Sequence, residues 1–300
     1  MNFVTCSYKN EEFVGIENSD YITAVNDILT AAEEKNIRSM LELIDAFSLD
    51  SGLYIRLERT DLSRFNSLSL REVQLKAPIP YPRRNIFCLG KNYAAHANEV
   101  QATKLSGSGI PTSPVYFTKT AMPALEHGGE IRYYTSATQQ VDYEAELAVI
   151  IGKQGINIRP EDAKEYIFGY TILNDVSARD LQVKHEQWFK GKNLDTFCPM
   201  GPVIVYKNDI PFPVQLDITC HVNGILRQND NTKSFIFDLP YIISDLSKGL
   251  TLYPGDIIST GTPAGVGAGA KPPRFLNDGD KIECTIEKIG TLTNIVKVIY

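Results

Sequence analysis

The sequence predicts a strand-rich α+β protein with a small N-terminal α+β domain. After residue 77 the chain is dominated by short apolar runs that glycine and proline separate, a pattern typical of strands. These runs do not alternate regularly with helical patterns, so a mixed or antiparallel sheet is expected instead of a parallel one. Residues 75–85 hold three prolines, which disfavour helix and remove backbone donors. We therefore expect two domains, residues 1–77 and 78–300.

The N-terminal domain is expected to combine strands and helices. Residues 11–26 indicate short strands that are joined by a turn at residues 18–20. Residues 27–47 contain strong helix formers, and their apolar side chains recur at helical spacing. This part of the chain therefore predicts a small α+β unit.

The second domain is expected to be built mainly from strands. A hairpin is predicted at residues 223–224, because an Asn-Gly pair readily adopts the positive φ angles of a tight two-residue turn. Short helices are predicted over residues 92–100, with Asn92 as the N-cap, and over 239–249. The main predicted strands span residues 85–90, 114–119, 142–153, 166–175 and 278–300, the last range holding a pair of strands.

Composition excludes several classes of protein. The 300 residues carry a formal net charge of −6 and contain no block of lysine and arginine, which argues against nucleic-acid binding. No apolar run approaches the roughly 18 residues of a membrane-spanning helix, and the N-terminus lacks a signal-peptide pattern. We therefore expect a cytoplasmic protein that binds no membrane. The five cysteines are scattered and form no C-x-x-C motif, which predicts reduced, packed thiols and no zinc site.

Three acidic residues share one face of the strand predicted over residues 142–153. Side chains alternate between the two faces of a strand, so Asp142, Glu144 and Glu146 point one way and an apolar set points the other. Carboxylates two residues apart repel each other, and a divalent cation would relieve that repulsion. Asp175, which ends the next predicted strand, is the best third ligand. Three carboxylates favour Mg²⁺ or Mn²⁺ over Ca²⁺ and leave coordination positions for substrate.

Two other interpretations of these acids stay open from the residues alone. Glu144 and Glu146 could lie on the solvent-exposed face of a half-buried strand. Asp175 could cap a helix, with Ser177 and Asp180 completing a capping box. The pattern by itself therefore suggests a metal site without establishing it.

Seven segments of the chain, in the same order, resemble those of a known enzyme family. From about residue 80 to 298 the chain resembles the fumarylacetoacetate hydrolase family, specifically its branch of acylpyruvate hydrolases and oxaloacetate decarboxylases. The matching segments are GKNYAAHANE, PVYFTK, DYEAELAVIIGK, GYTILNDVSARDLQ, GKNLDTFCPMGP, VNGILRQ and GDIISTGTPAGVG. The resemblance implies a mixed β-sandwich roll, usually a homodimer, with Glu144, Glu146 and Asp175 as metal ligands. Residues 1–75 lie outside the closely matching region.

A histidine and a glutamate share one face of the helix predicted over residues 92–100. His96 and Glu99 are three residues apart, a spacing at which the carboxylate could orient the imidazole as a general base. The spacing alone is more typical of a surface pair. The family resemblance implies that the pair is catalytic, lies on a mobile lid and activates water. The following stretch, residues 106–109, suits such a lid.

Further candidate residues follow from the same resemblance. It implies a catalytic role for Lys192 and a substrate contact for Gln182. Lys119 and Arg179 are further candidates for substrate binding, as is Thr262 within a glycine-rich turn. That turn, GTPAGVGAGAK, lacks the G-x-x-x-x-G-K-[ST] pattern of a phosphate-binding loop, so no nucleotide site is expected.

The expected function is Mg²⁺- or Mn²⁺-dependent chemistry on small 2-oxo acids, which are the predicted partners. The 1-carboxylate and 2-oxo group of such an acid can chelate a metal ion, which stabilises the enolate of pyruvate. Hydrolysis of acylpyruvates, fumarylpyruvate-type acids included, and decarboxylation of oxaloacetate both pass through that enolate. The alternatives are an isomerase, tautomerase or hydratase that acts on dienoic 2-oxo acids, or a non-catalytic metal-binding protein that acts through a partner.

Overall fold

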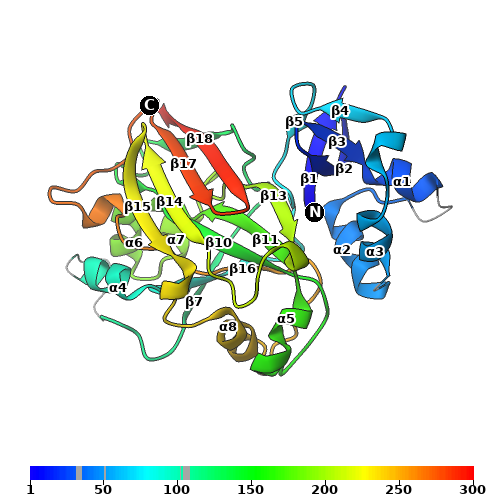
Figure 1. The fold of residues 1–300 in the computed structure, drawn as a ribbon. Helices are drawn as coiled ribbons and strands as arrows, with labels where there is room; N and C mark the ends of the chain where they lie inside the picture. Colours follow the sequence, from blue (N-terminus) through cyan, green and yellow to red (C-terminus); the bar gives the residue numbers. More distant parts are fainter. Residues whose placement is uncertain (32–35, 51, 102, 104–108) are drawn as a thin grey trace.

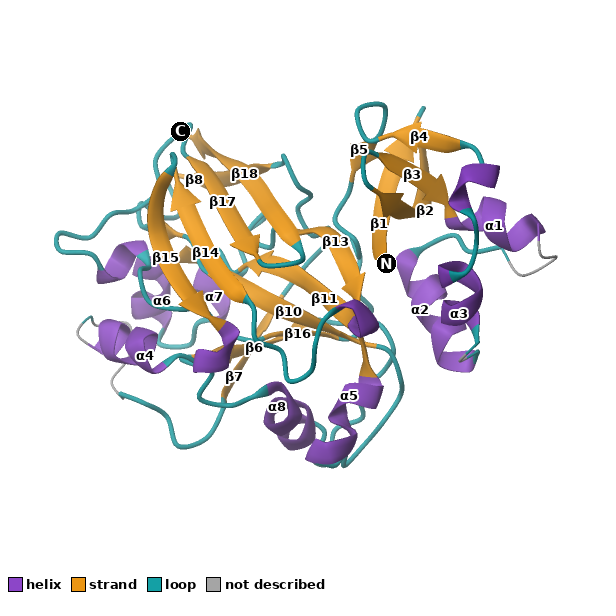
Figure 2. Cartoon of the chain, viewed as in Figure 1, coloured by secondary structure: helices purple, strands orange, loops and turns teal. Residues whose placement is uncertain are grey.

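The structure is a computed structural model that describes residues 1–31, 36–50, 52–101, 103 and 109–300. It is a strand-rich α+β fold with mixed sheets, as the sequence predicts (Figures 1 and 2). Figure 1 shows a small N-terminal unit, coloured blue to cyan, beside a larger unit in which two sheets are stacked. Residues 106–108 of the expected lid lie outside the described residues.

The N-terminal unit is a meander of short strands with helices beside it. Its strands are β1 (Asn2–Tyr8), β2 (Glu11–Asn18), β3 (Tyr21–Ala24), β4 (Ser67–Ser69) and β5 (Gln74–Leu75). Its helices are α1 (Val25–Ala31), α2 (Met40–Leu49), α3 (Leu53–Glu58) and the 3₁₀ helix η1 (Leu62–Arg64). The Ser39 side chain accepts a hydrogen bond from the Glu42 backbone N–H and so caps the start of α2.

The larger unit carries the remaining elements. Its strands are β6 (Ile86–Gly90), β7 (Val115–Lys119), β8 (Glu130–Tyr134), β9 (Val141–Asp142), β10 (Ala145–Ile151), β11 (Ile167–Asn174), β12 (Ser177–Ala178), β13 (Met200–Tyr206), β14 (Asp217–Val222), β15 (Ile225–Asn231), β16 (Ile257–Ser259), β17 (Lys281–Ile286) and β18 (Gly290–Ile299). Its α-helices are α4 (Ala94–Gln101), α5 (Ala163–Tyr166), α6 (Arg179–His185), α7 (Phe189–Lys192) and α8 (Leu239–Leu246). Its 3₁₀ helices are η2 (Pro160–Asp162), η3 (Lys207–Asp209), η4 (Thr232–Ser234) and η5 (Gly267–Gly269).

Two large sheets organise the chain. The first runs in the order β4-β3-β2-β1-β13-β11-β10-β16-β6-β7, with β5 added beside β1. The second runs β15-β14-β17-β18-β8, and β9 and β12 form a short separate pair. The pairs β16–β6 and β18–β8 are parallel, whereas β10 is antiparallel to both of its neighbours. The predicted hairpin is present, with Asn223 and Gly224 at positive φ between β14 and β15.

Strand β10 is buried on both faces, and each face has a different neighbour. Leu147 and Val149 belong to the core between the two large sheets, together with residues of β14 and β17. Ala148 and Ile150 belong to a second core, which includes Leu43 of α2. The alternation predicted for this strand is therefore present, and both faces are covered by protein.

The N-terminal unit is joined to the larger unit by a sheet and by a shared core. Strand β1 pairs antiparallel with β13, with Asn2 opposite Val205. Phe3 stacks on Phe168 of β11, with ring centroids 5.6 Å apart. The segment around residue 77 thus connects two units that also pack on each other.

One capping prediction is wrong. Asn92 does not cap α4, which begins at Ala94. Its side-chain amide instead donates to the carbonyl oxygens of Phe237 and Thr260, while its oxygen accepts from the Phe237 N–H. Asn92 is fully buried, so its side chain must form hydrogen bonds within the protein. It forms them with backbone groups far away in the sequence and not with the start of the helix.

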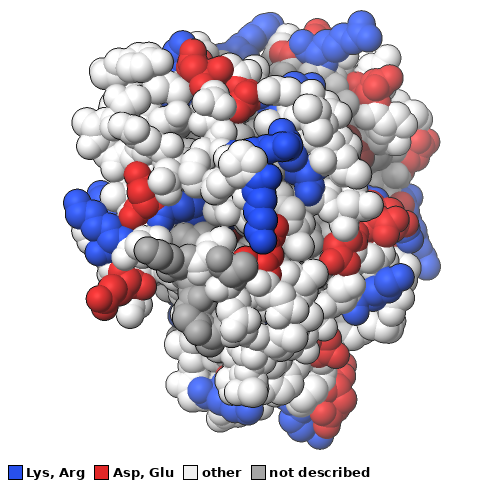
Figure 3. Space-filling model, turned by 90° about the vertical axis from the view of Figure 1, so that its left-hand side faces the viewer, with Lys and Arg blue, Asp and Glu red and all other residues white. Residues whose placement is uncertain are grey.

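Figure 3 shows acidic and basic side chains interspersed on the face that carries α4 and α6, with large uncharged areas between them. Among the described residues, no helix is both long and apolar enough to span a membrane.

Candidate active site

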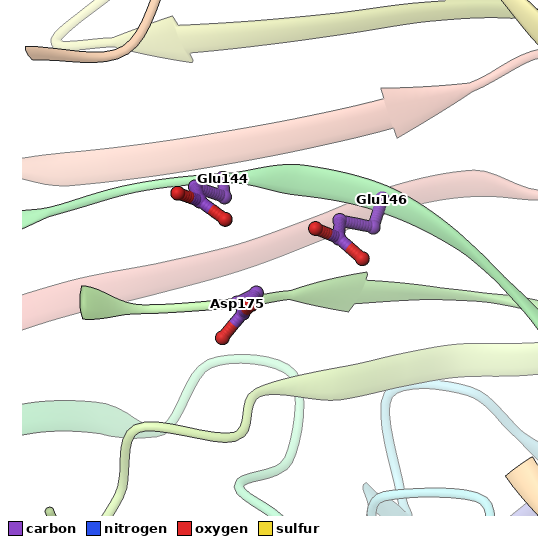
Figure 4. A group of neighbouring side chains, drawn as sticks. All are labelled: Glu144, Glu146 and Asp175. Carbon is purple, nitrogen blue, oxygen red and sulfur yellow. The ribbon is translucent and has the colours of Figure 1, made fainter. Parts of the chain in front are cut away.

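Three buried carboxylates converge where β10 begins and β11 ends. Glu146 lies on β10, Glu144 immediately before it, and Asp175 immediately after β11 (Figure 4). The antiparallel register, with Ala145 opposite Asn174, brings the two strand ends together. One carboxylate oxygen of each acid lies within 4.8 Å of the others. Because all three side chains are buried, neither glutamate lies on a solvent-exposed face.

Three cationic side chains surround these acids. Lys192 Nζ donates to Glu144 Oε2 at 2.8 Å and to Asp175 Oδ2 at 2.7 Å. Arg179 Nη1 lies 2.7 Å from Glu144 Oε1, and Lys119 Nζ lies 2.8 Å from Asp175 Oδ1. Burial would raise the pKa of Glu144, but Lys192, Arg179 and His96 together lower it to about 2. Glu144 is therefore ionised at neutral pH.

Glu146 is in a different electrostatic environment. Its Oε2 atom accepts hydrogen bonds from the Ser259 hydroxyl and the Gly261 backbone N–H. Burial, followed by the charges of Asp175 and Glu144, nevertheless raises the pKa of Glu146 well above its usual range. Among the described residues, no lysine or arginine forms an ion pair with Glu146, and the positive charge of Lys192 only partly offsets these effects.

The triad fits a divalent cation. The donor set consists of carboxylate oxygens only, as Mg²⁺ and Mn²⁺ prefer. Lys192 already places a positive charge between two of the three acids, so the position suits a cation. With Asp142 included, and with all four carboxylates ionised as metal ligation of Glu146 would require, four negative charges face three cationic side chains, which leaves one negative charge. A bound divalent ion would reverse that sign and attract an anionic substrate.

The histidine and glutamate of α4 lie beside the triad and form the expected pair. His96 Nδ1 lies 3.3 Å from Glu99 Oε2, and the His96 ring is buried. Both Glu99 carboxylate oxygens accept from the Gly265 backbone N–H, at 3.1 and 3.2 Å. The pair is therefore held by the glycine-rich loop and is not a surface pair on a polar helix.

A pocket opens over the triad and brings most candidate residues together. Seven of them line it: His96, Glu144, Glu146, Arg179, Gln182, Lys192 and Thr262. Gln182 accepts a hydrogen bond from Arg179 Nη1 at 3.0 Å. The Thr262 hydroxyl donates to the Ala145 carbonyl and accepts from Gln228, so its hydrogen bonds are already formed within the protein.

Lys119, like Glu99 and Asp175, is a candidate residue outside the pocket lining. It is fully buried, and its ammonium group contacts Asp175 and the carbonyl oxygens of Val176 and Lys192. Its contacts hold Asp175 and α7 in place, so a direct substrate contact for Lys119 stays a prediction without structural support.

The pocket contains residues that the sequence did not single out. Lys91, Phe117 and Trp188 line it, and Lys91 has a positive φ of 59°. A Cβ atom at Gly90 would lie 2.4 Å from Trp188 Cζ3, so this glycine lets the indole close one wall. Burial lowers the pKa of Lys91. Two signals in the sequence could have indicated these residues. Lys91 lies within the matching segment GKNYAAHANE, and Trp188 is the one tryptophan of the chain.

Asp142, the third acid of the predicted face, is not part of the triad. It accepts hydrogen bonds from the Gly267 and Ala268 backbone N–H groups at 2.7 and 2.9 Å. It also pairs with Arg179 Nε at 2.9 Å. Asp142 therefore connects the glycine-rich loop to the arginine that contacts Glu144.

Comparison with known proteins gives consistent matches. Residues 85–297 match the family described as fumarylacetoacetate (FAA) hydrolase, C-terminal. The chain is 53% identical over 226 residues to an oxaloacetate tautomerase of Bacillus subtilis (strain 168), covering 75% of this chain and 74% of that protein. It is 45% identical over 231 residues to a mitochondrial oxaloacetate tautomerase of Xenopus laevis, covering 76% and 70%. The solved structure of a fumarylacetoacetate hydrolase from Exiguobacterium antarcticum superposes with a TM-score of 0.84 at 40% identity over the whole of both chains.

Proposed function

Because the chain belongs to the fumarylacetoacetate hydrolase family, we propose that it is a divalent-metal-dependent enzyme whose substrate is oxaloacetate. The proposed reaction is the interconversion of the enol and keto forms of this 2-oxo acid. The observation that carries the proposal is the buried triad of Glu144, Glu146 and Asp175, because its two glutamates line the same pocket as His96. The names of the two tautomerase relatives favour this reaction over those expected first from the sequence.

The triad would hold Mg²⁺ or Mn²⁺. When bound, such an ion supplies positive charge that polarises a 2-oxo group and lowers the free energy of the enolate form. Lys192 adds a second positive charge at the same place, since its ammonium group contacts both Glu144 and Asp175.

Substrate binding is assigned to the cationic wall of the pocket. Arg179 lines the pocket, and its buried Nη2 atom has no hydrogen-bond partner among the described residues. A substrate carboxylate could accept from this atom, beside Gln182. Oxaloacetate carries a second carboxylate, and Lys91 gives the same pocket another ammonium group that could receive it.

Proton transfer is assigned to His96. Because Nδ1 faces Glu99, Nε2 is the ring nitrogen that is available to the substrate. In the keto-to-enol direction, Nε2 accepts a proton from C3, the C2–C3 double bond forms, and the C2 oxygen takes a proton from the Lys192 ammonium. Both side chains then return to their starting protonation states by exchange with water. In the opposite direction, exchange with water first leaves His96 protonated and Lys192 neutral. The C2 hydroxyl then gives its proton to Lys192 Nζ as the C2–O double bond re-forms, and His96 Nε2 delivers its proton to C3.

A second candidate function is hydrolysis of acylpyruvates. It is favoured by the His96–Glu99 pair, which could equally activate a water molecule, and by the name of the similar solved hydrolase. Decarboxylation of oxaloacetate needs no activated water and would share the enolate. Isomerisation or hydration of dienoic 2-oxo acids, and a non-catalytic role, complete the alternatives.

A turnover screen of purified protein distinguishes these functions. Enol-oxaloacetate, acylpyruvates and dienoic 2-oxo acids are each assayed with Mg²⁺ and with Mn²⁺, using wild type and Glu146→Gln. We expect enzyme-dependent loss of the enol absorbance in wild type and little in the variant. Faster turnover of an acylpyruvate than of oxaloacetate would favour the hydrolase, and no turnover of any substrate would favour the non-catalytic alternative.

The homodimer and the cytoplasmic location stay predictions. Light scattering of the purified protein would give twice the chain mass of 33.5 kDa if the homodimer is correct. A mass of 33.5 kDa at assay concentration would contradict it.

A further inference from the structure

We infer that the glycine-rich loop of residues 265–269 positions the His96–Glu99 pair, and that Asp142 fixes this loop. The inference rests on the proposed function, because it assigns His96 a part in the reaction. It gives a role to Asp142, the third acid of the predicted strand face, and to a glycine-rich segment that lacks the sequence pattern of a phosphate-binding loop. Gly265, Gly269 and Asp142 are positioning residues, since they act through Glu99.

Gly265 provides the backbone donor that holds Glu99. Its N–H group is shared between both carboxylate oxygens, at 3.1 and 3.2 Å. Its φ is +106°, and a Cβ atom there would lie 2.0 Å from the Arg227 carbonyl oxygen. A residue with a side chain could therefore not present this N–H in the same place. The carbonyl of Gly265 is also held, because it accepts from the Tyr143 hydroxyl at 3.0 Å.

Gly269 provides the surface on which the Glu99 side chain lies. A Cβ atom at Gly269 would be 2.2 Å from Glu99 Oε1 and 2.3 Å from both Cδ and Cγ. Such distances are far inside van der Waals contact, so Glu99 can occupy this position only because residue 269 has no side chain. Gly269 has an ordinary φ, and an alanine there would therefore be strained by Glu99 and not by its own backbone.

Asp142 ties the loop to the metal triad. It is fully buried and accepts from the N–H groups of Gly267 and Ala268, within the 3₁₀ helix between Gly265 and Gly269. It also accepts from the Tyr143 backbone N–H at 2.9 Å and pairs with Arg179, which in turn pairs with Glu144 of the triad. A continuous series of charge-assisted contacts thus runs from Glu144 through Arg179 and Asp142 to the loop, and from the loop through Glu99 to His96.

This arrangement has a specific consequence for His96. Glu99 fixes the ring through Nδ1 and so keeps Nε2 directed at the substrate. Displacing Glu99 should slow proton transfer while the triad keeps its affinity for metal. Removing Glu99 should have the same effect, and after its removal the size of residue 269 should no longer matter.

A double-mutant cycle tests the inference. Gly269→Ala, Glu99→Ala and the double variant are compared for kcat on enol-oxaloacetate and for Mn²⁺ affinity by calorimetry. We expect each single variant to lose kcat by roughly 10- to 100-fold, with Mn²⁺ affinity within about twofold of wild type. The double variant should be no slower than Glu99→Ala alone. Gly52→Ala is the matched control, since its nearest neighbours are side-chain ends of Arg56 and Asp50 at 3.1 and 3.3 Å.

Three results would overturn the inference. These are full kcat in Gly269→Ala, full kcat in Glu99→Ala, or losses that multiply in the double variant, as a general packing defect would produce. If wild type turns over none of the substrates, the proposed function fails and the inference is decided separately by ¹⁵N NMR of the imidazoles. The His96 ring nitrogens, assigned with His96→Asn, should then show a Nδ1–H tautomer in wild type and lose it in Gly269→Ala; identical spectra would contradict the inference.

Discussion

Lys192 Nζ lies 2.7 Å from Asp175 Oδ2, in an ion pair that is buried beneath the pocket. The same ammonium group also donates to Glu144, so one lysine holds together two of the three proposed metal ligands. Burial opposes its charge, but Asp175 and Glu144 raise the pKa of Lys192 above its ordinary value. Lys192 is therefore charged at neutral pH, and it both repels a bound cation and attracts an anionic substrate.

Lys192→Met should separate metal binding from turnover. Removing the ammonium leaves two neighbouring carboxylates without their shared partner, so Mn²⁺ should bind more tightly, by about tenfold. The kcat/KM for oxaloacetate should fall, because the substrate anion loses a positive charge. Calorimetry and steady-state kinetics measure the two effects. Lys190→Met, an exposed position on the same helix, should change neither. Weaker Mn²⁺ binding in Lys192→Met would contradict this account of the lysine.

His96→Asn should discriminate between reactions that need a base and one that does not. A general base typically contributes about 10²- to 10⁴-fold, or about 3–5 kcal/mol of barrier. Acylpyruvate hydrolysis and oxaloacetate tautomerisation should lose about that factor, whereas oxaloacetate decarboxylation should lose much less. The measurement is kcat/KM for the three reactions, with His185→Asn on an exposed part of α6 as the control. Equal losses in all three would mean that His96 does not act chiefly as a base.

The thiols should be unreactive until the protein unfolds. All five cysteines are free and buried. Burial raises the pKa of Cys6 and of Cys198 to about 12, and the pKa of Cys88 well above its usual range. The thiol form, which is the poor nucleophile, therefore persists at pH 8. Iodoacetamide at pH 8 should leave the native mass unchanged and add five groups after denaturation. Fewer than five additions without reductant would reveal a disulfide and contradict the predicted reduced state.

The N-terminal unit should unfold together with the larger unit. Phe3 is fully buried and packs on Phe168, so Phe3→Ala should lower the free energy of unfolding by about 3–5 kcal/mol. Because the core is shared, we expect one denaturant transition, shifted as a whole. Tyr21→Ala, at an exposed site on β3, is the control. Two separate transitions, only one of them shifted, would instead favour independent domains at 1–77 and 78–300.

The local patterns predicted the strands well because each strand face has a uniform environment. In β10, Leu147 and Val149 face one core and Ala148 and Ile150 face another, as period-two alternation requires. Glu144 and Asp175 are 31 positions apart in the sequence, and the register of β10 with β11 brings them together. Their sequence separation alone could not predict this contact. The place of Asp175 at a strand end suggested it as the third ligand, and the family resemblance implied the same residue.

Contacts between distant segments were the part that the sequence could not predict. The pairing of Asn2 with Val205 joins the ends of a long stretch of chain and leaves no local pattern. Asn92 looked like a helix cap, but backbone groups of Phe237 and Thr260 occupy its amide. Trp188 reaches the pocket because Gly90, the last residue of β6, has no side chain and lets the indole approach.

The proposed function depends above all on a bound divalent ion, and a titration of chelator-stripped protein with Mn²⁺ tests this claim. Wild type should bind one ion per chain and regain turnover as the site fills. Glu146→Gln should bind none at the same concentrations while its circular dichroism matches that of wild type. Glu130→Gln, at an exposed glutamate on β8, should behave like wild type. Full turnover after exhaustive chelation, or unchanged Mn²⁺ binding in Glu146→Gln, would contradict the claim.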